Sequence, residues 1–223
     1  MILPATLKFL KDLRKHNNKA WFDAHRPAYE AAKLNFQDFI QSVIEKHAKR
    51  DKDLLGLEAR KCLFRINRDV RFSKDKSPYK VNFGASMDKG GKKSGLAGYY
   101  FHLQPGESFV GGGIWMPEAA SLKKLRLEID YCLPEFRKIV ESGKFKKTFG
   151  TLYTGEGVQL KKLPQGFSAG NPAEKYLKFK SWLALAKLAD EELTSSRLVA
   201  KTAASFAVIQ PLIKFLNRPL EED

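Results

Sequence analysis

The sequence predicts an α+β protein, a single domain over residues 1–223 with a central, mostly antiparallel sheet packed by N-terminal, middle and C-terminal helices. Three observations predict this class. Apolar residues recur at helical spacing in the first third of the chain, the period becomes two in the middle, and helical spacing returns towards the end. No linker, repeat or low-complexity tract divides the chain, and its 43% hydrophobic content is ample for a packed core.

The N-terminal helices are defined by their apolar stripes. Leu3, Leu7, Leu10 and Leu13 mark the first helix, and the segment "KAWF" predicts a short second one that buries Trp21 and Phe22. Pro27 suits the first turn of a longer third helix. The core-facing stripe of that helix comprises Tyr29, Ala32, Phe36, Phe39, Ile40, Val43 and His47.

The middle of the chain reads as strands. The segment "KCLFRINRDVR", residues 61–71, predicts a half-buried strand with Cys62, Phe64 and Ile66 on its inner side, and residues 81–87 predict a second strand. Residues 99–104 and 108–115 should pair as a hairpin, because Pro105 and Gly106 suit the central positions of a type II turn. Glycines 111–113 in that hairpin indicate either a bulge, the commoner cause, or the close approach of another backbone or a ligand.

Helices follow at residues 118–131 and 134–140, with Leu122, Leu125 and Ile129 on the inner face of the first. Residues 144–170 are rich in glycine and ambiguous, with short strands expected around "VQLKKLP", residues 158–164. The aromatic start of "FKSWLALAKLA", residues 179–189, favours a strand over a helix. A final helix begins near Ser196, and Pro211 should kink it.

The bulk composition bounds the function. The chain carries 40 Lys and Arg against 25 Asp and Glu, a net charge of +15, so its field should attract polyanions or anionic small molecules. Two cysteines make no disulfide framework, and Cys62 and Cys132 are expected to be buried thiols. The N-terminus lacks the apolar core of a signal peptide and no uninterrupted apolar run approaches the ~20 residues of a membrane span, which together predict a cytoplasmic protein without membrane contact.

The positive charge is clustered between residues 60 and 80. Eight basic residues stand there against two aspartates, and Arg65, Arg68 and Arg71 recur at a spacing of three. Guanidinium groups bind phosphate or carboxylate bidentately, whereas lysine would serve for a merely solvated surface. Asp69, flanked by arginines, should stay ionised and position them.

The residues expected to bind an anionic ligand are the charged and hydroxyl-bearing residues of the basic segment, together with the one histidine expected in the sheet. They are Arg65, Arg68, Asp69, Arg71, Ser73, Lys74, Lys76, Ser77, Tyr79, Lys80 and His102. The alternative interpretation is structural: an Arg and Asp network can hold an irregular loop against a sheet. A strand histidine is likewise more often a structural residue than a catalytic one.

Other motifs point to no known chemistry. The segment "GGKKSG" lacks the glycine that a phosphate-binding loop needs before its Lys-Ser pair, because Lys92 stands there. The four histidines and two cysteines lack metal-ligand spacing, and no Gly-x-Ser-x-Gly elbow is present. The motifs therefore assign no metal, no cofactor and no reaction.

Three segments carry a family resemblance. They are "NNKAWFDAHRPAYE" (residues 17–30), "FRINRDVRFSKDKSPYKVNFGA" (64–85) and "YYFHLQPGESFVGGGIWMP" (99–117). They resemble the domain-of-unknown-function 2461 family of conserved hypothetical proteins of bacteria and fungi, and the resemblance extends over nearly the whole chain. It implies a single domain but no activity. His25 departs from the asparagine expected there, which speaks against a catalytic role for this residue.

The leading hypothesis is thus a site for a phosphorylated or other anionic ligand, in a protein whose status as an enzyme is open. The alternative is a nucleic-acid-binding protein, which the net charge and the lysines of residues 89–93 favour. Against it, most aromatic residues lie at core spacing. A third hypothesis is a basic surface that meets an acidic protein.

Overall fold

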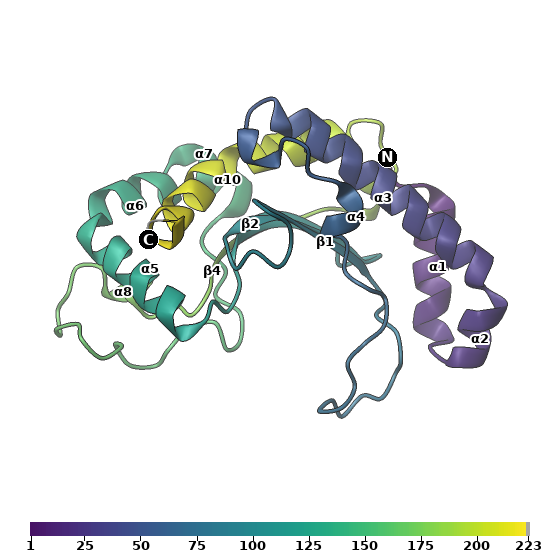
Figure 1. Cartoon of the computed structure of the whole chain (residues 1–223), viewed down its shortest axis with the longest axis horizontal. Helices are drawn as coiled ribbons and strands as arrows, with labels where there is room; N and C mark the ends of the chain where they lie inside the picture. The colour runs from purple at the N-terminus through teal and green to yellow at the C-terminus, as the bar shows by residue number, and fades with distance from the viewer. Residues whose placement is uncertain (222–223) are drawn as a thin grey trace. The chain divides into compact units, whose positions relative to one another are not determined.

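The computed structural model describes residues 1–221, which form helices around one four-stranded antiparallel sheet, an α+β fold as predicted (Figure 1). The strands are β1 (Phe83–Asp88), β2 (Gly98–Leu103), β3 (Phe109–Ile114) and β4 (Trp182–Lys187), hydrogen-bonded in that order. The helices before the sheet are α1 (Pro4–Lys15), α2 (Lys19–Ala24), α3 (Arg26–Ala48), the 3-10 helix η1 (Lys52–Leu54) and α4 (Ala59–Cys62). The later helices are α5 (Ala119–Tyr131), α6 (Leu133–Val140), α7 (Gly143–Phe149), α8 (Glu174–Leu177), α9 (Asp190–Leu193) and α10 (Leu198–Glu221).

The described chain groups into two compact units. Unit 1 comprises residues 1–92, 100–110 and 187–204, and unit 2 comprises residues 93–99, 111–186 and those from Ser205 onward.

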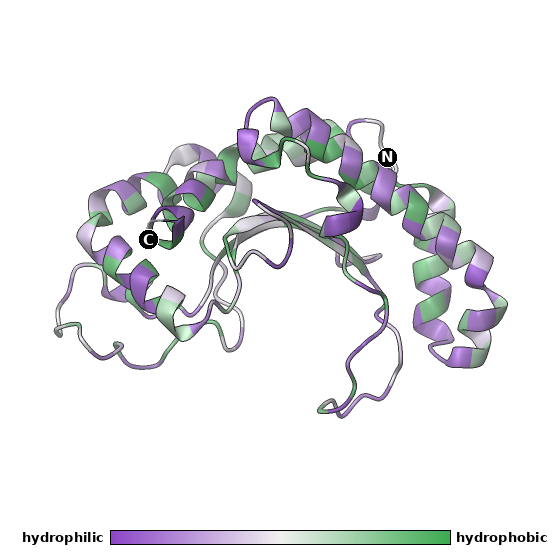
Figure 2. Cartoon of the chain, viewed as in Figure 1, coloured by the Kyte–Doolittle hydropathy of each residue, from purple (hydrophilic) through white to green (hydrophobic). Residues whose placement is uncertain are grey.

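Unit 1 is built on the aromatic face of α3. Hydrophobic and hydrophilic residues alternate along α1 and α3 (Figure 2), as in amphipathic helices. Phe36 stacks on Phe83 of β1 with ring centroids 5.5 Å apart, and Phe39 meets Phe101 of β2 edge-on at 4.8 Å. Each such buried ring contributes about 1.5–3 kcal/mol. Since side chains alternate along a strand, this packing turns Gly84, Ser86, Tyr100 and His102 to the opposite face.

Unit 2 packs its own aromatic cluster. Phe136 of α6 lies 4.9 Å from the Tyr176 ring and 5.2 Å from the Phe215 ring of α10. The glycines of β3 permit close backbone approach, because a Cβ built on Gly112 would lie 2.6 Å from the carbonyl oxygen of Gly98. The structure thus favours close approach over a bulge there.

Helix α10 is long and apolar enough, by length and composition, to cross a membrane. Half of its most apolar window is buried inside the protein, which is typical of a core helix. The helix therefore gives little support for a membrane span.

Most predicted elements are confirmed, including α1 to α3, the β2–β3 hairpin and β4. The backbone of Glu107 donates to the Gln104 carbonyl at 2.8 Å, and Gly106 has φ +82°, as the type II turn requires. The predicted burial is wrong for Trp21, which is half-buried, whereas Phe22 is buried. Cys62 is buried as expected, but Cys132 is half-buried.

Two predicted strands are wrong. Residues 61–71 begin as the end of α4, make isolated bridges at Leu63 and Asn67, and leave the sheet as a long loop (Figure 1). The charged side chains that follow Asn67 keep this segment in water instead of in a ladder. Residues 158–164 form only one bridge, from Gln159 to Phe179, and Pro164 has no N–H to extend the pairing.

Candidate functional site

The basic segment forms a loop that is closed at its base by backbone pairing. Arg68 N–H donates to the Pro78 carbonyl at 2.9 Å, and Lys80 N–H donates to the Ile66 carbonyl at 2.8 Å. We call residues 68–78 the basic loop. Figure 1 shows it running out from the sheet between α4 and β1 and returning.

The two arginines of the basic loop are paired within it. Arg71 binds Asp69 bidentately, with Nε–Oδ1 and Nη2–Oδ2 distances of 3.0 and 2.7 Å. Arg68 forms an ion pair with Asp75 and donates to the Ser73 hydroxyl at 3.3 Å. The hydrogen bonds from Arg71 lower the pKa of Asp69, as expected for a carboxylate that stays ionised. Arg68 and Arg71 are therefore each paired with a different aspartate of the loop.

The remaining loop residues brace it. Ser77 N–H donates to Asp75 at 2.9 Å, and the hydrogen bonds from Ser77, followed by that from Arg68, lower the pKa of Asp75 to about 2. Lys76 donates to the Val70 carbonyl at 3.0 Å. Lys74 is exposed. Together these contacts hold the loop in one conformation, in line with the structural alternative for this part of the segment.

Tyr79 fixes the base of the basic loop. The Asn17 side chain accepts from Tyr79 N–H at 3.1 Å and donates to the Tyr79 carbonyl at 2.9 Å. The Tyr79 ring is buried and stacks on Phe22 at 4.0 Å. This tyrosine therefore anchors the loop to the turn between α1 and α2 and offers no surface to a ligand.

Three other cations converge beside the base of the loop. The Nζ atoms of Lys80 and Lys92 lie 5.6 and 5.8 Å from the centroid of the Phe64 ring, and Lys92 also donates to the Leu63 carbonyl. Burial lowers the pKa of Lys80, and the positive charges of Arg65 and Lys92 lower it further. We call Arg65, Lys80 and Lys92 the cation cluster.

The cation cluster has no carboxylate paired with it in residues 1–221, although the charge of Arg65 acts on Asp69 and, in addition to the hydrogen bonds from Arg71, lowers the pKa of that carboxyl group. Among residues 1–221, no Asp or Glu carboxylate forms a salt bridge with any of its three side chains. Mutual repulsion disfavours such an arrangement unless water or an anion lies against it. This is the part of the basic segment that is electrostatically open.

A row of polar and aromatic side chains lies beside the cluster on the sheet. The Phe64 ring is 6.3 Å from that of Tyr100, and His102 stacks on Phe109 at 4.6 Å. The Tyr100 hydroxyl lies 3.3 Å from Nδ1 of His102, and Nε2 of His102 lies 3.2 Å from Oε1 of Gln104. Because an amide oxygen only accepts, Nε2 carries the proton and Nδ1 accepts from Tyr100.

Burial keeps this row uncharged near neutral pH. It lowers the pKa of His102 and raises that of Tyr100 to about 12. Both nitrogens of His102 have partners, so its ring is held in place and its proton-accepting nitrogen is occupied. The arrangement provides a neutral, partly apolar wall next to the cation cluster.

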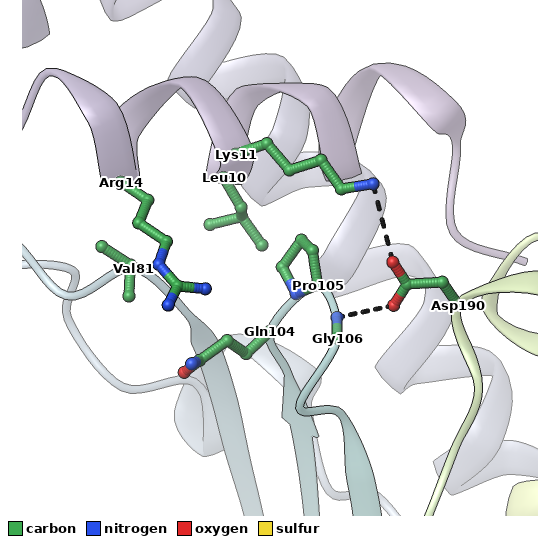
Figure 3. Close-up of a pocket in the computed structure, with 8 residues that line it drawn as sticks. All are labelled: Leu10, Lys11, Arg14, Val81, Gln104, Pro105, Gly106 and Asp190. Carbon is green, nitrogen blue, oxygen red and sulfur yellow. Dashed lines mark hydrogen bonds and ion pairs between the residues drawn. The ribbon is translucent and has the colours of Figure 1, made fainter.

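The described part of the chain also contains a small pocket of about 270 Å³ in unit 1 (Figure 3). Arg14 reaches into it from α1 towards Gln104 and Val81, and Lys11 is paired with Asp190 at 3.6 Å. Asp190 also accepts from Gly106 N–H at 2.8 Å. The volume of the pocket is below the usual range of ligand pockets, and its one acidic residue, Asp190, is already bound to Lys11 and Gly106. The cation cluster is therefore the better candidate for a ligand site.

Reactive groups of other kinds give no competing site. Among residues 1–221, no three His, Cys, Asp or Glu side chains are placed to hold a metal ion. Burial raises the pKa of Cys62 to about 12, which makes its thiol a poor nucleophile.

Sequence reasoning found part of this site. It named Arg65, Lys80 and His102. It missed Lys92, which stands in a connection between strands, and it assigned Phe64 to the inner side of a strand. A period-two pattern predicts which face of a strand each side chain lies on. It does not predict the position of side chains in a segment that leaves the sheet.

Comparison with known proteins supplies a family. No curated protein and no solved structure matches the chain. A family model described as "Conserved hypothetical protein (DUF2461)" matches residues 5–215, which is nearly the whole chain and includes every residue of the site. The chain therefore belongs to this DUF2461 family.

Proposed function

We propose that unit 1 binds a small anionic ligand, of the phosphate-bearing class, at the cation cluster of Arg65, Lys80 and Lys92. The observation that carries the proposal is that Lys80 and Lys92 lie over the Phe64 ring, Arg65 adds its charge to theirs, and none of the three forms a salt bridge with a carboxylate in the described chain. A bound phosphate would relieve their mutual repulsion and accept charge-assisted hydrogen bonds from them.

The surroundings of the cluster support a ligand with an apolar part. Phe64 is 41% exposed, and Tyr100, His102 and Phe109 continue from it as a neutral wall. An aromatic or aliphatic portion of the ligand would pack there while its anionic group meets the cations. The proposal concerns binding, in a protein that we place in the cytoplasm and away from membranes.

The test is calorimetric titration of the purified protein with inorganic pyrophosphate at low ionic strength. We expect the substitutions Lys80→Gln and Lys92→Gln to weaken binding by about tenfold to hundredfold each, since a hydrogen bond to a charged group contributes about 1.5–3 kcal/mol. The Arg71→Ala variant should bind as the unaltered protein does, because that guanidinium is held by Asp69.

The matched control is Lys162→Gln, which removes one charge from an exposed lysine of unit 2. An equal loss of affinity in this control would mean that net charge alone attracts the anion. Absence of pyrophosphate binding by the unaltered protein at low salt would refute the proposal.

A further inference from the structure

The tip of the basic loop presents an aromatic ring to solvent. Phe72 is 96% exposed, the largest value among the exposed large hydrophobic side chains of the described chain. The next is Tyr131 of unit 2, at 90%. A single exposed leucine or valine needs no explanation, but a solvated phenylalanine at the end of a projecting loop keeps a large stacking surface available.

The loop holds this ring in a defined place. The Arg68–Asp75 ion pair closes its neck, and Ser73 N–H donates to the Val70 carbonyl at 3.3 Å on one side of the tip. Lys76 donates to the same carbonyl at 3.0 Å. A tip that is braced before binding loses less conformational freedom when a partner arrives.

Positive charge surrounds the ring. The guanidinium carbon of Arg71 lies 5.8 Å from the centroid of Phe72, and Lys74 is exposed two residues further on. The basic loop contains four basic residues and two aspartates. Both aspartates are paired with arginines of the loop, and the side chains of Arg71, Lys74 and Lys76 are all exposed to solvent.

We infer that the tip of the basic loop binds single-stranded nucleic acid, with an unpaired base stacked on Phe72 and backbone phosphates near Arg71, Lys74 and Lys76. This inference goes beyond the proposed small-ligand site, because it uses none of the cation cluster. Stacking of bases on exposed aromatic rings beside a positively charged surface is the general mode of sequence-tolerant single-strand binding. Paired bases expose no free face to such a ring, so single strands are favoured over duplex.

A lipid surface fits the tip less well. Stable membrane anchoring takes more than one apolar element, and the tip offers one exposed ring with only the half-buried Val70 beside it. One ring is enough to stack one base, so the arrangement matches nucleic acid.

The experiment is fluorescence anisotropy of a labelled twelve-nucleotide oligothymidylate and of a duplex of equal length, over a salt series. We expect the unaltered protein to prefer the single strand and Phe72→Ala to weaken that binding by about fivefold to hundredfold. Phe72→Trp should retain or exceed the original affinity. Lys74→Gln should reduce the salt slope by about 0.7, whereas Phe72→Ala should leave the slope unchanged.

The matched control is Tyr131→Ala, which removes an almost equally exposed ring from unit 2 and should not change affinity. Equal oligonucleotide binding by the unaltered and Phe72→Ala proteins would overturn the inference. It would also be overturned if the protein bound vesicles of phosphatidylserine and phosphatidylcholine through Phe72 but did not bind the oligonucleotide. Pyrophosphate titration of Phe72→Ala separates the two proposals, because this variant should keep the small-ligand site intact.

Discussion

Asp88 shows how strongly one residue depends on its surroundings. Its side chain is only 6% exposed, it accepts a 2.7 Å hydrogen bond from Ser86, and no Lys or Arg of the described chain forms a salt bridge with it. Burial therefore raises the pKa of its carboxyl group to about 6. The sequence shows an ordinary aspartate after an apolar strand, and gives no sign of this change.

The raised pKa predicts a pH-dependent stability difference between the unaltered protein and Asp88→Asn. Between about pH 4 and pH 6 the folded protein holds a proton that the unfolded chain has released, so Asp88 makes the folded state less stable as pH rises. Asparagine keeps the acceptor for Ser86 without the charge. Asp88→Asn should therefore gain stability relative to the unaltered protein from pH 4 to pH 7, by on the order of 3 kcal/mol.

Urea unfolding of both proteins at several pH values measures this difference. A stability difference that stays constant from pH 4 to pH 7 would mean that Asp88 is ionised normally in the folded protein.

At the scale of elements, the polar face of the sheet depends on how β1 and β2 fit together. The Tyr100 side chain of β2 lies across Gly84 of β1, where a built Cβ would be 2.5 Å from its hydroxyl oxygen. The absence of a side chain at Gly84 thus lets Tyr100 reach Nδ1 of His102 while lying flat on the neighbouring strand.

We predict that Gly84→Ala destabilises the protein by about 1–3 kcal/mol, because the added methyl group displaces the Tyr100 hydroxyl. The same substitution in a Tyr100→Phe background should cost much less, since the closest remaining ring atom is 3.3 Å away. A double-mutant cycle from urea denaturation gives the coupling energy. A coupling energy near zero would mean that the destabilisation by Gly84→Ala does not come from contact with the Tyr100 hydroxyl.

At the scale of the whole molecule, contacts far apart in sequence join the segments of each unit. The Asn217 side chain of α10 is buried, accepts from Ala97 N–H at 2.7 Å and donates to the Ala97 carbonyl at 3.1 Å, across 120 positions of sequence. Through these bonds an amide side chain completes the backbone pairing at the start of β2 in unit 2.

Asn217→Ala should lower the free energy of unfolding by about 2–4 kcal/mol, because it leaves both buried backbone groups of Ala97 without a partner. Asn217→Asp keeps the acceptor but buries a charge, so it should be at least as destabilising at neutral pH and partly recover as the pH falls. Thermal or urea unfolding of the two variants tests this, and near-normal stability of Asn217→Ala would show that water replaces the amide.

The sequence by itself determined the fold class, the family, most helices, the β2–β3 hairpin and the location of the excess charge. These features depend on residues close together in the sequence: the helical and strand periods, the Pro-Gly turn and the local charge count. They can therefore be predicted from the sequence without knowledge of the tertiary structure. The stripe from Ala32 to His47 predicted the core face of α3 for this reason.

Only the tertiary structure decided which of the charged side chains form ion pairs within the protein. Arg65, Arg68 and Arg71 look alike in the sequence, yet Arg68 and Arg71 are paired with aspartates of their own loop, and Arg65 adds its charge to Lys80 and Lys92 without a salt bridge to a carboxylate of the described chain. The exposure of Phe72 and the proximity of Lys92 to Phe64 also depend on where the chain leaves the sheet. The physical reason is that pairing, burial and desolvation are set by distances in space between groups that sequence spacing does not fix.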